Sequence, residues 1–165
     1  MEMVPYPLAM EVVSMKIQNT DDIKKVSAYL HDAIFSKNAI RYYADKKEFV
    51  LETTRFMWEK CVSRRVFLFI HRWEAPWINC TLKFKEVLEC QIIKHDDLDF
   101  FEFGGIEIKE NNALLEMFTP YGLTIKIRIN EIDGEFEDIG LPFEKKMRSR
   151  IYGFRKFSPF KRSKE

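Results

Sequence analysis

The spacing of apolar residues changes once along the chain, and this change limits the fold to one helix and many strands. Over Ile23–Ile34, apolar residues recur at intervals of three and four, which is typical of an amphipathic helix. From Ile40 to Ile129 they recur with a period of two, in short runs separated by polar turns. Strands that follow one another without intervening helices favour antiparallel pairing. The sequence predicts an α+β fold, with one packed amphipathic helix on a curved antiparallel sheet or partial barrel of about eight strands.

The helix carries recognisable end signals. Asn19 or Thr20 can cap its first turn, and the two aspartates that follow suit the positive end of the helix dipole. Its apolar stripe runs through Ile34, so we expect the helix to end at Lys37–Asn38, with Asn38 in a left-handed conformation.

The strands are predicted from alternation and from their turn residues. Pro120 and Gly122 suit a tight turn, and Gly104-Gly105 suits a bulge or sharp bend. The acidic stretch Glu131–Ile139 is either a last edge strand or a loop. The other expected strands are Glu11–Gln18, Ile40–Ala44, Glu48–Arg55, Arg64–Trp73, Ile78–Phe84, Val87–Lys94, Phe100–Lys109, Ala113–Phe118 and Leu123–Ile129.

Arg64–Trp73 is the most aromatic of these strands. Its alternation puts apolar residues on both faces, which indicates burial on both sides or a dimer contact. The residues expected in such a homodimer seam are Phe67, Phe69 and His71.

The charge of the chain is divided between an acidic body and a basic tail. Lys145–Glu165 holds nine Lys/Arg and one acid, whereas the other residues hold 18 basic and 25 acidic side chains. We predict a single α+β domain over residues 1–142 and a basic, aromatic tail over 143–165. The tail residues expected to contact an acidic protein or nucleic acid are Arg148, Arg150, Tyr152, Arg155, Lys156, Lys161 and Arg162.

The sequence favours a reducing compartment. The three cysteines (Cys61, Cys80 and Cys90) are odd in number and widely spaced, so we expect free thiols. The first 18 residues lack the layout of a signal peptide, and no apolar run is long enough for a transmembrane segment. A cytoplasmic location is therefore predicted.

Residues for catalysis or metal binding are not grouped in any familiar motif. The chain has no phosphate loop, dinucleotide fingerprint, nucleophile elbow or zinc-protease motif. His31, His71 and the turn His95-Asp96-Asp97 have no partners at functional spacing. No catalytic residue, metal site or cofactor is predicted.

The densest cluster of chemically useful side chains is Arg55-Phe56-Met57-Trp58-Glu59. Arg55 can hold a carboxylate with two hydrogen bonds, and Asp32 near the helix end is a plausible partner. One interpretation is a clamp between helix and sheet. The other is a small pocket for an anionic ligand, lined by Asp32, Arg55, Trp58 and Glu59.

Two stretches, Ser27–Ala33 (SAYLHDA) and Arg55–Glu59 (RFMWE), resemble the hallmarks of a small bacterial family of unknown function. Its pattern is a short strand, a helix of the S-A-x-L-x-D-A type, a hairpin ending in R-F-x-W-E, and an antiparallel meander. The resemblance covers about Met15 to Pro142 and departs from the pattern at Arg64–Asn79 and in the tail. It implies a fold but no activity.

Three functions are compatible with these features. The first is a non-enzymatic binding or adaptor module whose basic tail contacts an acidic partner or its own body. The second is an enzyme of unfamiliar class with a pocket near Asp32, Arg55 and Glu59. The third is a structural protein that oligomerises through Arg64–Trp73.

Overall fold

The computed structural model describes residues 12–143 apart from 68–69, 95–97, 110 and 112. These residues form one α-helix, two one-turn 3-10 helices and thirteen strands. The helices are α1 (Thr20–Leu30), η1 (Lys37–Ala39) and η2 (Trp58–Lys60). The strands are β1 (Ser14–Ile17), β2 (Ile34–Ser36), β3 (Ile40–Tyr43), β4 (Glu48–Phe56), β5 (Val62–Phe67), β6 (Ile70–Glu74), β7 (Trp77–Phe84), β8 (Val87–Lys94), β9 (Phe100–Glu102), β10 (Gly105–Lys109), β11 (Leu114–Phe118), β12 (Leu123–Ile129) and β13 (Gly134–Phe143).

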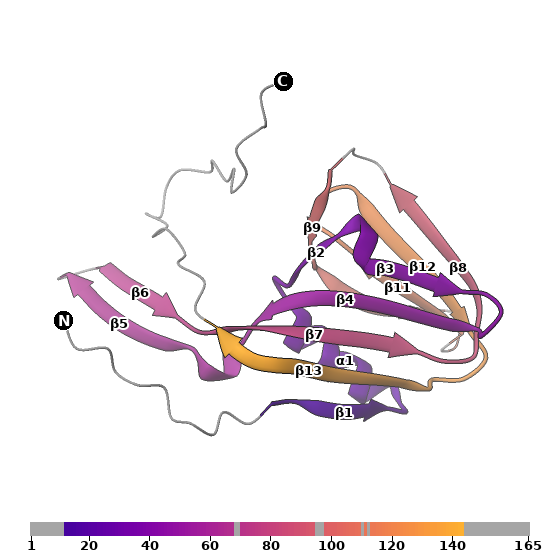
Figure 1. Cartoon of the computed structure of the whole chain (residues 1–165), viewed down its shortest axis with the longest axis horizontal. Helices are drawn as coiled ribbons and strands as arrows, with labels where there is room; N and C mark the ends of the chain where they lie inside the picture. Colours follow the sequence, from indigo (N-terminus) through magenta and orange to yellow (C-terminus); the bar gives the residue numbers. More distant parts are fainter. Residues whose placement is uncertain (1–11, 68–69, 95–97, 110, 112, 144–165) are drawn as a thin grey trace.

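Two antiparallel sheets face each other like the sides of a wedge (Figure 1). The larger has the order β1-β13-β7-β4-β2-β9, with β3 also paired to β4, and the smaller has the order β10-β11-β12-β8. Within the described part of the chain, each order has two ends, so neither sheet closes into a barrel. The predicted α+β fold with a curved antiparallel sheet is confirmed.

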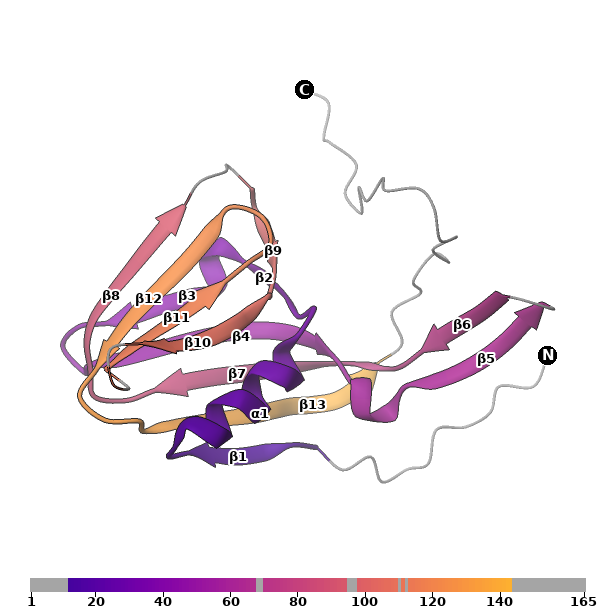
Figure 2. The same ribbon diagram turned by 180° about the vertical axis from the view of Figure 1, so that it is seen from behind.

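The core fills the space between the two sheets, and α1 lies along one open side of it (Figure 2). The helix buries Ile23, Val26 and Leu30 against the sheets, as its apolar spacing predicts. The Oγ of Ser27 accepts a hydrogen bond from the backbone N–H of Ile106 at 3.0 Å. The helix therefore covers the outer edge of β10, which among the described strands pairs only with β11.

Several local signals form the expected structures. The side chain of Asn19 accepts hydrogen bonds from the backbone N–H groups of Asp21 and Asp22, each at 3.0 Å, and so caps α1. The β3–β4 and β11–β12 hairpins form, and Gly122 in the second turn has a φ of 75°. At Gly104 the chain passes from one sheet to the other, and a Cβ there would lie 2.8 Å from the ring of Phe118. The predicted sharp bend is confirmed.

The predicted end of the helix is wrong. The α1 helix stops at Leu30, and the left-handed residue is Asp32, with a φ of 64°, rather than Asn38. Beyond it, the backbone O of Ala33 accepts a hydrogen bond from Phe103 N at 2.7 Å, and Ile34 pairs with β4 and β9. Ala33 and Ile34 therefore join the sheet, although the spacing of apolar residues also suits a helix there.

The predicted single strand Arg64–Trp73 is also wrong. This segment forms the two strands β5 and β6, which pair with each other in a separate two-stranded sheet. Phe67 lies opposite Ile70, so the chain reverses between them. No Gly, Pro, Asn or Asp marks this reversal in the sequence.

The acidic stretch Glu131–Ile139 is not an edge strand or loop. Most of it lies in β13, which runs between β1 and β7 in the interior of the larger sheet. Its alternation places Phe136 and Asp138 inward and Glu135 and Glu137 outward. Consecutive strands are not all neighbours, as a meander would require, because β7 and β8, β8 and β9, β9 and β10, and β12 and β13 belong to different sheets.

Candidate functional site

Arg55 is the central residue of the candidate site, and its position in β4 explains why it is buried. Alternation along β4 turns Phe49, Leu51, Thr53 and Arg55 toward the core. The arginine side chain has no exposed surface. A buried cation must have carboxylate partners, because leaving its charge unpaired in the core costs several kcal/mol, on the order of 3–5.

Two carboxylates satisfy the guanidinium. Nε and Nη2 of Arg55 donate to Oδ1 and Oδ2 of Asp138 on β13, each at 2.7 Å. Nη1 and Nη2 also donate to Oε2 and Oε1 of Glu59 on η2, at 3.1 and 2.7 Å. Both contacts have the two-pronged geometry that gives Arg–carboxylate pairs their strength. Burial alone would lower the pKa of Arg55, but the hydrogen bonds to Asp138 and Glu59 outweigh it and raise that pKa above its ordinary value.

Aromatic rings enclose the same group. The guanidinium carbon of Arg55 lies 5.1 Å from the ring centre of Tyr29 on α1 and 5.9 Å from that of Phe136 on β13. The two rings are stacked, with centres 5.9 Å apart. Asp138 further accepts a hydrogen bond from the backbone N–H of Val13, just before β1. Arg55 therefore ties together α1, β4, η2, β13 and the chain before β1.

The structure brings only part of the predicted ligand site together. Arg55 and Glu59 form a pair, but Asp32 is not a partner of Arg55; its carboxylate lies 3.1 Å from Nδ1 of His31. Trp58 donates from its indole N–H to the backbone O of His31 at 3.1 Å, at the end of α1. This is the arrangement of a clamp between helix and sheet.

Sequence analysis missed Asp138 and Tyr29. Asp138 lies 83 positions from Arg55 in the sequence, and no local motif joins them. One signal was available, because Asp138 follows Phe136 by two residues and must share its face of a strand. An inward acid needs an inward cation, and Arg55 is the cation on the buried face of β4.

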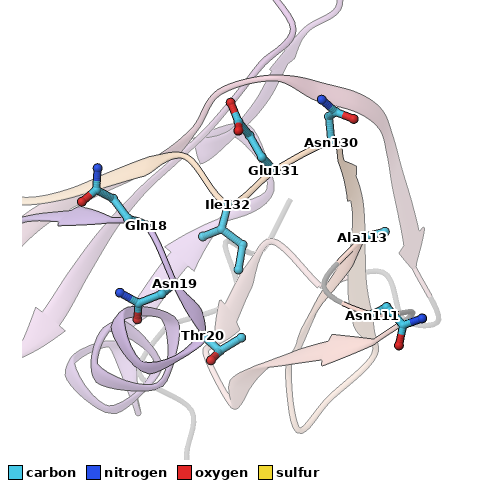
Figure 3. Close-up of a pocket in the computed structure, with 8 residues that line it drawn as sticks. All are labelled: Gln18, Asn19, Thr20, Asn111, Ala113, Asn130, Glu131 and Ile132. Carbon is cyan, nitrogen blue, oxygen red and sulfur yellow. The ribbon is translucent and has the colours of Figure 1, made fainter.

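A second candidate is a shallow cavity of about 390 Å³ between the start of α1 and the loop before β13 (Figure 3). It is polar and rich in amides, but the Oδ1 of Asn19 is already occupied in capping α1. Its lining residues are Gln18, Asn19, Thr20, Asn111, Ala113, Asn130, Glu131 and Ile132.

In the described part of the chain, the other side chains considered for catalysis or metal binding do not lie together in a site. Three or more His, Cys, Asp or Glu side chains that could hold a metal ion are not found together there. None of the described helices is long and apolar enough to cross a membrane. His95-Asp96-Asp97 lies outside the described residues, as do the predicted tail contacts Arg148, Arg150, Tyr152, Arg155, Lys156, Lys161 and Arg162.

The three cysteines are free thiols in different surroundings, and this predicts an order of reactivity. Cys80 is buried on β7, and burial raises its pKa strongly; burial also raises the pKa of Cys90 to about 11 and that of Cys61 by less. Because the thiolate is the nucleophile, we expect iodoacetamide to label Cys61 first, Cys90 more slowly and Cys80 last at neutral pH. Mass spectrometry over time checks this order, with urea-unfolded protein as the control. Equal rates for Cys80 and Cys61 in the native protein would contradict it.

Comparison with protein families gives one result that covers most of the chain. Residues 14–150 match the model of a family described as protein of unknown function, DUF2948. The chain belongs to the DUF2948 family. The match includes every strand from β1 to β13, so this DUF2948 fold contains the Arg55 clamp. Comparisons with curated proteins and with solved structures find no match.

Proposed function

We propose that this DUF2948 protein is a non-enzymatic binding module whose basic end contacts an anionic partner. The observation that carries the proposal is the separation of charge. Nine Lys/Arg lie in Lys145–Glu165, while the rest of the chain has an excess of acids. Such a segment attracts polyanions and speeds their association.

The described chain ends near the arginine-containing β5–β6 hairpin. β13 ends at Phe143, opposite Trp77 at the start of β7. β6 ends at Glu74, three residues before Trp77, and the β5–β6 hairpin contains Arg64, Arg65 and Arg72. Phe143, the last described residue, therefore lies near the base of a hairpin that is rich in arginine, and the basic stretch follows it in the sequence.

An enzyme with an anion-binding pocket near Arg55 would need a cation that its substrate can reach, and Arg55 is not accessible. The guanidinium of Arg55 is sealed from solvent and bound to Asp138 and Glu59. An anionic substrate would have to displace a buried carboxylate, which is costly. We propose that Arg55, Trp58 and Glu59 have a structural role.

The ion pairs of the acidic body argue against docking of the basic tail on its own chain. The nearest acidic stretch, Glu131–Asp138, has already paired two of its acids. Asp138 is buried with Arg55, and Glu135 forms an ion pair with Lys85 at 2.5 Å. An external anionic partner is the better match for the tail charge.

A chain ending at Phe143 tests the proposal. We expect it to elute from immobilised heparin at lower salt than the full chain, and to lose at least about tenfold in heparin affinity at fixed salt, because nine cations are removed. Isothermal titration calorimetry at several salt concentrations measures the change. A matched full-length variant with the tail aromatics replaced by Ser keeps the charge and should retain most of the heparin affinity. Unchanged binding by the truncated chain would contradict the proposal.

A further inference from the structure

β8 lies at one edge of the smaller sheet, and among the described strands it pairs only with β12. It has 8 residues, whereas the other edge strands of the two main sheets are shorter: β1 and β3 have 4, β9 has 3 and β10 has 5. Both ribbon views show β8 at the outer boundary of the wedge (Figures 1 and 2). A long edge strand pairs readily with another chain unless a helix, a proline or a run of charges protects it.

Hydrogen bonds of β12 show which backbone groups of β8 point to the open edge. At the two ends of β12, Leu123 O accepts from Thr119 N and Ile129 N donates to Ala113 O, both on the side of β11. Backbone groups alternate in direction along an antiparallel ladder, so the odd-numbered residues of β12 bond toward β11 and the even-numbered ones toward β8. The register shift lies at Arg128/Ile129, outside the regular pairs used here. The residues of β8 that lie opposite odd-numbered residues, and so direct their N–H and C=O groups to the open edge, include Cys90 and Ile92.

In the described chain, the larger sheet contacts the open edge of β8 at its first residue. Val87 N donates to Lys47 O at 2.9 Å, and the hydroxyl of Tyr42 donates to Val87 O at 3.4 Å. Beyond this point the strand is uncovered, with Leu88 51% exposed and Ile92 49% exposed. Ile92 lies opposite the buried Ile125, so even the inner face of β8 is open to solvent here. An exposed strand with apolar side chains beside free backbone groups is a surface for strand pairing.

We propose that two copies of this chain pair through β8, antiparallel to each other, with a two-fold axis at Gln91. The uncovered stretch runs from Leu88 to Lys94 and Gln91 is its centre, so this register pairs the whole stretch with its copy. Cys90 then lies opposite Ile92 of the second copy. Both residues direct their backbone groups to the edge, so each such pair exchanges two hydrogen bonds. The two smaller sheets become one continuous sheet.

The side chains of β8 fit this register. Cys90 and Ile92 cover each other on the inner face, where Ile92 is half exposed in the single chain. On the outer face, Gln91 lies opposite Gln91, and Glu89 lies opposite Ile93 of the second copy. Like charges therefore do not oppose one another along the stretch.

An extended segment of another protein fits the same edge less well, because β8 offers it no single sign of charge. Its charged residues are one acid, Glu89, and one base, Lys94, near opposite ends of the strand. A second copy needs no further selection, because the strand complements itself. This inference is independent of the proposed function, since neither the basic tail nor its anionic partner takes part in the contact.

Sedimentation equilibrium of the full chain at several protein concentrations tests the contact. We expect a monomer–dimer equilibrium that Ile93→Glu weakens roughly tenfold, because symmetry places two new acids against the two Glu89 side chains. Ile93→Lys is the matched control: it changes the same side chain but places a cation opposite Glu89, so it should dimerise at least as well as the original chain. Adding Glu89→Gln to Ile93→Glu removes the repulsion and should recover most of the affinity. Circular dichroism confirms that each variant is folded.

A disulfide across the axis tests the register without introducing charge repulsion. Gln91→Cys brings two thiols together at the axis, and mild oxidation with diamide should give a covalent dimer on a non-reducing gel. Lys126→Cys is the matched control, because Lys126 lies opposite Gln91 on β12 and faces the same side of the sheet. Three strand spacings, roughly 14 Å, separate it from its copy, which is too far for a disulfide. The original chain, oxidised in parallel, measures the background from the native cysteines.

Two results would overturn the inference. A chain that sediments as a monomer at every concentration, with Gln91→Cys cross-linking no more than Lys126→Cys, would leave the edge of β8 to an extended segment of another protein. Self-association that Ile93→Glu and Ile93→Lys change equally would assign the contact to another surface. Loss of heparin binding in the truncated chain tests the tail separately, so either proposal can fail while the other stands.

Discussion

Replacing Arg55 with Met is expected to lower the free energy of unfolding by about 3–5 kcal/mol, the usual cost of removing one partner from a buried ion pair. The loss arises because Asp138, whose side chain has no exposed surface, keeps its charge in the core without its cation. Contacts of the guanidinium with Tyr29 and Phe136 are lost as well. Urea unfolding followed by tryptophan fluorescence measures the change.

A double substitution separates the buried charge from the lost contacts. Arg55→Met/Asp138→Leu removes both charges, and well-packed apolar replacements of a buried pair are often neutral or stabilising. We therefore expect the double variant to be more stable than Arg55→Met alone. The exposed Arg41–Glu52 pair between β3 and β4 is the control, and Arg41→Met should change the free energy of unfolding far less than Arg55→Met does. A double variant less stable than Arg55→Met would contradict this expectation and would show that losing the hydrogen bond from Val13 N to Asp138 outweighs removal of the unpaired charge.

Local signals in the sequence predicted local structure well. The cap at Asn19, the β3–β4 and β11–β12 hairpins, Gly122 and the bend at Gly104 all depend on residues close together in the chain. The Arg55–Glu59 pair is of the same kind, with a separation of four residues. Such features follow from short-range geometry, which alternation and turn chemistry encode.

Features that depend on long-range pairing were predicted poorly. The helix ends early because Ala33 and Ile34 join a sheet whose partner strands, β4 and β9, come later in the chain. The interior position of β13 depends on β1 and β7, which are distant in sequence. Its glutamates are typical of an edge strand, which is why an edge position was predicted. Each glutamate faces outward, so acidity on one face did not exclude burial of the other.

The candidate site shows the same division. From the sequence, Arg55 had two interpretations, a clamp between helix and sheet or part of a pocket for an anionic ligand, and Asp32 was its expected partner because an acid near the end of a helix favours a cation. The actual partner, Asp138, reaches Arg55 only because β13 and β4 both flank β7. Local sequence patterns do not determine the order of strands in a sheet.

Replacing Phe136 with Ala is expected to cost about 3–5 kcal/mol, as is usual for a fully buried aromatic side chain. Phe136 has no exposed surface, and its ring stacks on Tyr29 and lies 5.9 Å from the guanidinium carbon of Arg55. The substitution leaves a cavity beside a buried charge. Loss of the ring also weakens the contact between α1 and the larger sheet. Urea unfolding measures the loss.

Phe143→Ala is the matched control, because it changes the same side chain on the same strand. Phe143 is 40% exposed, so its loss should cost about 1 kcal/mol or less. The comparison tests the interior position of β13 directly. If β13 were an edge strand that packs loosely, the two substitutions would have similar small effects. A large difference between the two substitutions would mean that β13 buries both Phe136 and Asp138 in the core. The stability of the fold and the position of the Arg55 clamp would then depend on the same strand.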